Sequence, residues 1–176
     1  MKRTVKQAIT EEMEKLSKFP QVVFLGENVT NSGRIYGTLD QVPLSKCIEM
    51  PLAENLIAGV AIGLSLRGYH PICIFQRMDF MLCAADAIVN HAALIPKMSG
   101  GRVKLPLMFR TIKANLNPDF FVGHQHSKDL TGIFSPYLQV FEVPAFPVNL
   151  AYNKAYFTNN PTLIVEDYKE FNTELE

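Results

Sequence analysis

The chain has 176 residues, 48% of them hydrophobic, and its 17 basic residues balance 17 acidic ones, so the formal net charge is zero. This length fits one globular domain with a sizeable core. The balanced charge argues against binding to nucleic acid or to an anionic membrane surface, and no apolar run is long enough to span a bilayer.

The cysteines and the first residues bear on location. Cys47, Cys73 and Cys83 are an odd number and lack the spacing of a metal site, which indicates reduced thiols in a reducing compartment. The first sixteen residues, MKRTVKQAITEEMEKL, carry too much charge for a secretory signal. We therefore expect a cytoplasmic protein.

Predicted helices and strands alternate along the chain. Thr4 and Gln7 form a capping box for an amphipathic helix, and the five predicted helices cover 4–18, 53–67, 80–95, 127–134 and 148–157. Short apolar runs are typical of buried strands, and they cover 22–25, 71–75, 105–109, 138–143 and 162–166. Long loops are expected at 28–46 and 111–126.

This alternation predicts an α/β fold in three layers, with a mainly parallel sheet and helices on both faces. Residues 1–167 would form one domain, and the polar residues 168–176 would form a tail that frays or links. In such sheets, ligands bind beyond the carboxyl ends of the strands. The loops that follow Leu25, Phe75 and Phe109 would meet there.

The predicted helix at 53–67 is unusually apolar. Residues 55–66 include no charged side chain and are apolar on nearly every face, which is typical of a buried helix. Gly59 and Gly63 leave a stripe that another backbone can approach closely. One acid, Glu54, stands at the start of this helix.

Two interpretations of Glu54 follow from this stretch alone. An acid in the first turn can interact with unpaired N–H groups and with the helix dipole, which is worth about 1 kcal/mol or less. Alternatively, a carboxyl at the entrance of an apolar helix serves a ligand. The apolar surroundings favour the neutral acid, whereas the helix N-terminus favours the carboxylate.

Several segments resemble the beta subunits of the thiamine-diphosphate-dependent 2-oxoacid dehydrogenases, such as pyruvate, branched-chain and acetoin dehydrogenases. The most specific segment is DFMLCAADAIVNHAALIPKMSGG at 79–101, in register with EMPLAEN at 49–55. Further matching segments are LGENV at 25–29, AGVAIGLSLRGYHPIC at 58–73, LPLMFR at 105–110, QHS at 125–127 and NNPTLIVED at 159–167. The resemblance implies a transketolase-like domain that binds the aminopyrimidine half of thiamine diphosphate.

The resemblance also implies roles for five residues. Glu54 matches the glutamate that hydrogen-bonds the pyrimidine N1′ and favours the imino tautomer needed for catalysis. Phe80 matches an aromatic residue stacked on the pyrimidine, and Gln76 and Leu52 match neighbours of that ring. His126 matches a catalytic histidine at the substrate end of the site. Without the resemblance, Phe80 would be interpreted as a core residue and His126 as a loop residue.

No metal site made of side chains is expected, because the pair His124 and His126 lacks a third ligand nearby in the sequence. The family can hold a monovalent cation through backbone carbonyls, and the matching positions are Leu107, Ala155, Thr158 and Asn160. The G-D-G…N motif for Mg²⁺ and diphosphate does not occur. The resemblance therefore implies that a diphosphate-binding alpha-type subunit holds Mg²⁺.

The chain departs from the family at two places. The loop between Arg110 and His126 is longer than usual and lacks the R-G-P-x-G pattern, so we expect an altered substrate pocket. The sequence also stops where family members continue into a C-terminal transketolase-type domain. Absence of that domain fits a natural split enzyme, with a separate C-terminal-domain subunit, as well as a truncated beta subunit.

We therefore expect a subunit that supports 2-oxo acid decarboxylation and acyl transfer only with its partner, in a homodimer or hetero-tetramer. Two alternatives stay open. One is the ketol-transfer subunit of a split transketolase-type enzyme, and the other is a non-catalytic regulatory or interaction subunit. The presence of both Glu54 and Phe80 argues against the second alternative.

Overall fold

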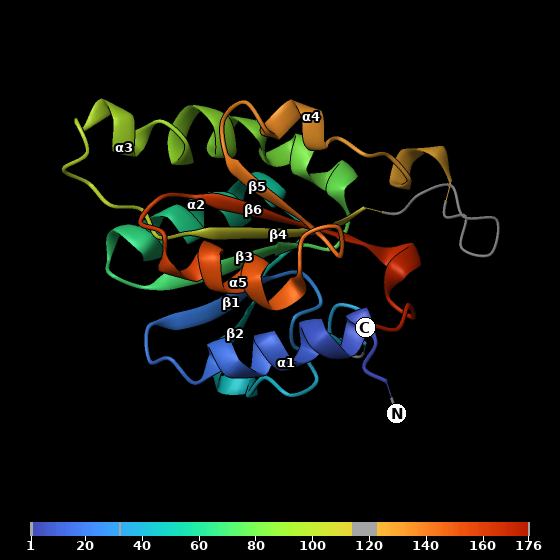
Figure 1. The fold of residues 1–176 in the computed structure, drawn as a ribbon. Coiled ribbons are helices and arrows are strands. Elements are labelled where there is room, and N and C mark those ends of the chain that lie inside the picture. Colours follow the sequence, from blue (N-terminus) through green and yellow to red (C-terminus); the bar gives the residue numbers. More distant parts are fainter. Residues whose placement is uncertain (1, 32, 114–122, 176) are drawn as a thin grey trace.

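A parallel sheet of six strands forms the middle of the molecule (Figure 1). The computed structural model describes residues 2–31, 33–113 and 123–175. The strand order is β2-β1-β3-β4-β6-β5, and each neighbouring pair is parallel. The strands are β1 (Val22–Gly26), β2 (Cys47–Glu49), β3 (His70–Phe75), β4 (Met108–Lys113), β5 (Gln139–Val143) and β6 (Thr162–Asp167). The predicted three-layer α/β fold is confirmed, and β2 is a strand that the sequence did not predict.

Helices cover both faces of the sheet, because successive strand side chains point to opposite faces. Phe24 and Ile72 belong to one apolar cluster with α1 and α5, whereas Leu25 and Cys73 belong to a second cluster with α2 and the segment 78–98. A shift of register by one residue would exchange these two sets, so the clusters fix the strand pairing. The α-helices are α1 (Val5–Ser17), α2 (Glu54–Leu66), α3 (Ile95–Met98), α4 (Thr131–Phe134) and α5 (Val148–Phe157).

The first helix and the last residues hold each other. The predicted capping box is confirmed, since Thr4 Oγ1 accepts from the Gln7 amide at 3.2 Å and Gln7 Oε1 accepts from the Thr4 amide at 2.8 Å. The next unpaired amide, that of Val5, donates to the carbonyl of Thr173 at 3.0 Å. Phe171 is buried. The tail was expected to fray, but residues 168–175 pack on α1 because they satisfy its first turn.

The prediction of one regular helix over residues 80–95 is wrong. A 3₁₀ helix (Met78–Ala84), a π-helix (Ala87–Ala92) and α3 follow one another, with a bend of 68° after the first. Pro96 lies at the second position of α3, where its missing N–H is tolerated. No single helix in the described ranges is long and apolar enough to cross a membrane, although this bent pair passes by length and composition.

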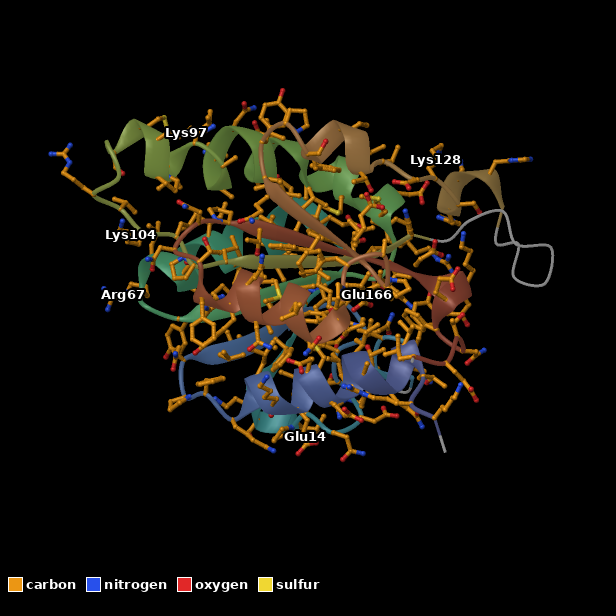
Figure 2. The ribbon with its side chains drawn as sticks, in the orientation of Figure 1. Glu14, Arg67, Lys97, Lys104, Lys128 and Glu166 are labelled. Carbon is orange, nitrogen blue, oxygen red and sulfur yellow. The ribbon has the colours of Figure 1, made fainter. Side chains whose placement is uncertain are left out.

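The strand predicted at 105–109 begins three residues later and ends four residues later, at Lys113, and its extension past 109 includes a buried charge. Arg110 donates from Nε and Nη2 to the two carboxylate oxygens of Glu166 on β6, both at 2.8 Å. Tyr152 on α5 also donates to Glu166, which Figure 2 labels inside the molecule. Because these charges pair with each other, the strand can carry them through the core.

The region around the second predicted loop also differs from the expectation. Residues 111–113 belong to β4, and residues 114–122 lie outside the described residues. A 3₁₀ turn covers His124–His126, and α4 begins only at Thr131. The start predicted for this helix at residue 127 is wrong, and Asp129 Oδ1 accepts from the Thr131 amide at 3.0 Å where α4 begins.

One face of α2 is exposed, although its composition predicted a buried helix. Ile57 and Ala61 are buried, whereas Leu56 is 50% exposed. A Cβ built at Gly59 or Gly63 meets no atom within 4 Å. The described chain therefore leaves the glycine stripe uncovered.

Candidate functional site

A small pocket opens at the carboxyl ends of β1 and β3. Glu27 directly follows β1, Gln76 directly follows β3, and Glu54 is the first residue of α2. The pocket is lined by Glu27, Glu54, Ile57, Ile74, Phe75, Gln76 and Phe80. The fold thus brings together three residues predicted to bind a cofactor, Glu54, Gln76 and Phe80, at the edge where α/β sheets bind ligands.

Larger hollows lie elsewhere on the surface, including one of about 670 Å³ between α3 and the starts of β5 and β6. Its only ionisable side chains are Lys97 and Tyr137. The smaller pocket combines two carboxylates with an aromatic ring and apolar walls, a combination typical of catalytic sites. We therefore take the smaller pocket as the candidate site.

Glu54 is placed to meet a ligand. Residue Ala53 caps α2 without a side-chain hydrogen bond, and Glu54 follows it in the first turn. Within the described ranges, the Glu54 carboxylate makes no hydrogen bond or ion pair. Under the capping interpretation, Glu54 would therefore interact only with the helix dipole. Its apolar neighbours Ile57 and Phe75 line the same pocket.

Gln76 is held by the loop that follows β1. Asn28, which has a positive φ of 60°, donates from Nδ2 to Oε1 of Gln76 at 3.0 Å. The amides of Asn28 and Thr30 donate to the Glu49 carboxylate at 2.6 and 2.8 Å. Burial raises the pKa of Glu49, but these hydrogen bonds outweigh burial and leave its pKa below the usual 4.5. An ionised Glu49 thus anchors the loop that orients Gln76.

His126 lies beside the pocket rather than in its lining. Its ring meets the Phe80 ring edge-on, with centroids 5.3 Å apart. Its Nδ1 is buried and has no partner within the described part of the chain, and its carbonyl accepts from Arg77 Nη1 at 3.3 Å. Lys128, labelled in Figure 2 beside this turn, forms an ion pair with Asp79 at 3.5 Å. This pair ties the turn to the segment that carries Phe80.

The structure does not bring every predicted residue to the pocket. Leu52 is 70% exposed and is absent from the lining. The carbonyl of Leu107, predicted to hold a cation, accepts from the Thr162 amide at 2.9 Å, and the amide of Asn160 donates to Thr158 Oγ1 at 3.4 Å. These residues flank the starts of β4 and β6, at the opposite edge from the pocket, and Ala155 is buried in α5. Among the described residues, no group of three or more His, Cys, Asp or Glu side chains could hold a metal ion.

Glu27 is a pocket residue that was not predicted. An acid immediately after a buried parallel strand is the signal that could have identified it, since that position lies at the ligand-binding edge. With Glu54 it gives the pocket two acidic groups.

Comparison with known sequences places these residues in context. Residues 1–113 match the family model described as transketolase, pyrimidine binding domain. The chain is 34% identical over 140 residues to the pyruvate dehydrogenase E1 component subunit beta of Rickettsia conorii, covering 77% of this chain and 42% of that protein. It is 37% identical over 134 residues to the mitochondrial subunit of Chaetomium thermophilum, covering 72% of this chain and 34% of that one. The chain thus spans about two fifths or less of the length of these relatives.

Solved structures show the same fold. A structure described as a split gene transketolase in an inactive beta4 tetramer aligns with a TM-score of 0.72 and 21% identity, covering 100% of this chain and 54% of that one. A proposed thiamin diphosphate-dependent enzyme from Mycobacterium smegmatis aligns with a TM-score of 0.65 and 16% identity, covering 94% of this chain and 31% of that one.

Proposed function

Because the chain belongs to the transketolase pyrimidine-binding domain family, we propose that it supplies the aminopyrimidine side of a thiamine diphosphate site. The enzyme would decarboxylate a 2-oxo acid and transfer the acyl group. The observation that carries this proposal is the meeting of Glu54, Gln76 and Phe80 in one pocket at the carboxyl ends of the strands.

The residues present fit an aminopyrimidine. A flat ring with basic nitrogens needs an aromatic surface and an acid beside it, and Phe80 and Glu54 offer these groups from neighbouring elements. Glu54 would hold a hydrogen bond at a ring nitrogen, and Phe80 would pack on the ring face. Gln76, oriented by Asn28, would contact the ring edge. Ile57 and Phe75 would exclude water from that contact.

When bound, thiamine diphosphate supplies the electron sink for breaking the bond between the carboxyl and carbonyl carbons of a 2-oxo acid. His126, beside Phe80, would hold or move a proton at the substrate end. Its Nδ1, which is buried and has no partner among the described residues, supports this role. Leu52, which is 70% exposed before α2, would be a neighbour of the ring in the assembled site.

We also propose that this chain works with a diphosphate-binding alpha-type subunit, which would hold Mg²⁺. The relatives are named as beta subunits of a pyruvate dehydrogenase component, and the exposed glycine stripe of α2 offers a surface for close helix packing. The working enzyme would be a homodimer or a hetero-tetramer. The part of the relatives that this chain does not span would come from the rest of a longer protein or from a separate subunit.

Calorimetry with thiamine diphosphate and Mg²⁺ tests the shared site. The isolated chain should bind weakly and show no turnover, whereas the chain mixed with its alpha-type subunit should bind tightly and release CO₂ from a 2-oxo acid. Tight, Mg²⁺-dependent binding by the isolated chain would contradict the proposal.

Ketol transfer is a second candidate, favoured by the split gene transketolase whose fold covers the whole chain. Substrates separate the two reactions. Release of CO₂ from 2-oxo acids supports the first function, and transfer of a two-carbon unit between sugar phosphates supports the second.

A further inference from the structure

Residues 33–37 form a left-handed turn close to the candidate site. Their φ angles are all positive, including 52° at Ile35 and 57° at Tyr36. The amide of Gly37 donates to the carbonyl of Gly33 at 2.6 Å, which closes the turn. In this conformation Cβ crowds the backbone, most severely for a β-branched residue such as Ile35. Such a turn persists only where surrounding contacts hold it.

Contacts on several sides hold the turn. Arg34 donates from Nε to the carbonyl of Val29 at 3.1 Å and from Nη2 to the carbonyl of Val42 at 2.9 Å. Ile35 is buried, and Thr38 Oγ1, at the end of the turn, accepts from the buried guanidinium of Arg110 at 2.7 Å. The turn is therefore fixed to the core of the sheet.

The fixed turn presents Tyr36 to the two residues that follow β3. Burial raises the pKa of Tyr36 above 10.0, although Arg77 and a hydrogen bond with Gln76 act in the opposite direction. Gln76 Oε1 also accepts from Asn28 at 3.0 Å, so Tyr36 and Asn28 hold the same side chain.

Gln76 and Arg77 lead to the two ends of the candidate site. Gln76 lines the pocket together with Glu54, and Arg77 donates to the carbonyl of His126 at 3.3 Å. We propose that Tyr36 is a positioning residue: its hydroxyl fixes Gln76 and Arg77, and so sets His126 beside the pocket. The role of His126 in this inference rests on the proposed function.

Nuclear magnetic resonance of histidine-labelled protein tests the positioning without turnover. Tyr36→Phe should shift the imidazole signals of His126 and leave those of His91 unchanged. Tyr156→Phe is the matched control, because it removes a phenol oxygen that accepts from Gln21 Nε2 at 2.7 Å away from the site. The control should shift His70, whose ring stacks on Tyr156 at 4.7 Å, and leave His126 unchanged.

Unchanged His126 signals in a folded Tyr36→Phe variant would overturn the proposal. If that variant does not fold, 3-fluorotyrosine placed at position 36 keeps the ring and hydroxyl but changes the hydrogen-bonding strength of the hydroxyl, because fluorine makes the phenol more acidic. It should still shift the His126 signals, and no shift would again overturn the proposal.

Kinetics of the assembled enzyme separate positioning from cofactor binding. Tyr36→Phe should lower kcat/KM at least about tenfold, the scale of a small misplacement of a catalytic group. Exchange of the thiazolium C2 proton, which depends on Glu54, should fall less than kcat/KM, because Asn28 still holds Gln76 at 3.0 Å. If the His126 signals shift but kcat/KM is unchanged, the effect of Tyr36 on catalysis is contradicted. Normal exchange in Glu54→Gln would instead contradict the proposed function, and the resonance test of Tyr36 would still stand.

Discussion

Glu54 and Phe80 line the same pocket, although Glu54 begins α2 and Phe80 lies in the 3₁₀ helix that follows β3. An acid beside an aromatic ring, with apolar walls, can bind a flat basic ring and keep water from the hydrogen bond that the acid makes. A helix-capping acid would need no such ring. The relationship between these two side chains therefore favours the interpretation in which Glu54 serves a ligand.

Glu54→Gln should abolish most activity and leave the fold intact. The amide keeps the size of the side chain but cannot supply the acid, so kcat in the assembled enzyme should fall at least about a hundredfold, the usual scale for a general acid or base. The melting temperature of the isolated chain should change little, because the carboxylate makes no hydrogen bond within the described part of the chain.

Glu14→Gln is the control, since the Glu14 carboxylate forms a surface ion pair with Lys18 at 3.0 Å on α1. It should leave the rate unchanged. If Glu54 were only a first-turn helix residue, Glu54→Gln would keep nearly full activity and lower stability by about 1 kcal/mol or less. Exchange of the thiazolium C2 proton, followed by NMR in the assembled enzyme, measures the effect at the cofactor itself.

Arg110→Met should strongly destabilise the chain. Both partners of the Arg110–Glu166 pair are fully buried, and loss of the cation leaves an uncompensated carboxylate in the core. The free energy of unfolding, measured in urea, should fall by about 3–5 kcal/mol.

The triple variant Arg110→Met/Tyr152→Phe/Glu166→Met tests the cause of that loss. It removes the whole polar group, including the phenol that donates to Glu166. It should recover most of the lost stability, since apolar replacement of a buried ion pair can be neutral. A triple variant as unstable as Arg110→Met would show that the packing volume, and not the charge, matters.

The layers of the fold could be predicted because strands buried on both faces are continuous apolar runs. That rule failed at β4, where Arg110 and Thr111 are buried polar residues. A segment with a charged residue is interpreted as a loop when the distant residue that pairs with that charge in the core is unknown. The prediction that the tail frays was wrong for a related reason. The carbonyl of Thr173 accepts a hydrogen bond from an amide in the first turn of α1, which is distant in the sequence.

The candidate site was predicted unevenly. The resemblance assigned Glu54, Gln76 and Phe80, and the fold brings them together. Spacing alone could not do so, because their meeting depends on the parallel order of β1 and β3. Leu52, which is 70% exposed, stays a prediction, because a family match does not report exposure.

His70 should make the fold sensitive to mild acid. Burial lowers its pKa to about 4 from the usual 6.5. Between these two pH values the unfolded chain binds a proton that the folded chain does not bind. The free energy of unfolding therefore falls as pH falls through this window, by up to about 3 kcal/mol at its lower end.

The variant His70→Phe keeps a ring against Tyr156 and should flatten the stability curve between pH 6.5 and 4. Thermal unfolding across this range measures the effect. His91→Gln is the control, because the His91 side chain is 58% exposed, and it should leave the curve unchanged. An equally steep curve in His70→Phe would mean that another group takes up the proton.

Gly63→Leu should separate folding from assembly. A Cβ at Gly63 meets no atom of the neighbouring elements in the described chain within 4 Å, and leucine is a better helix former than glycine by up to about 1 kcal/mol. The isolated chain should therefore melt at the same or a higher temperature. A partner helix packed against the glycine stripe would meet the new side chain, so the dissociation constant for the alpha-type subunit should rise about tenfold or more, equivalent to ~1.4 kcal/mol.

Gly132→Leu in α4 is the matched control, since Gly132 is also helical and open, and it should leave association unchanged. Sedimentation of each variant with the alpha-type subunit measures both outcomes. Equal association of Gly63→Leu and the unmodified chain would show that the partner docks on another face.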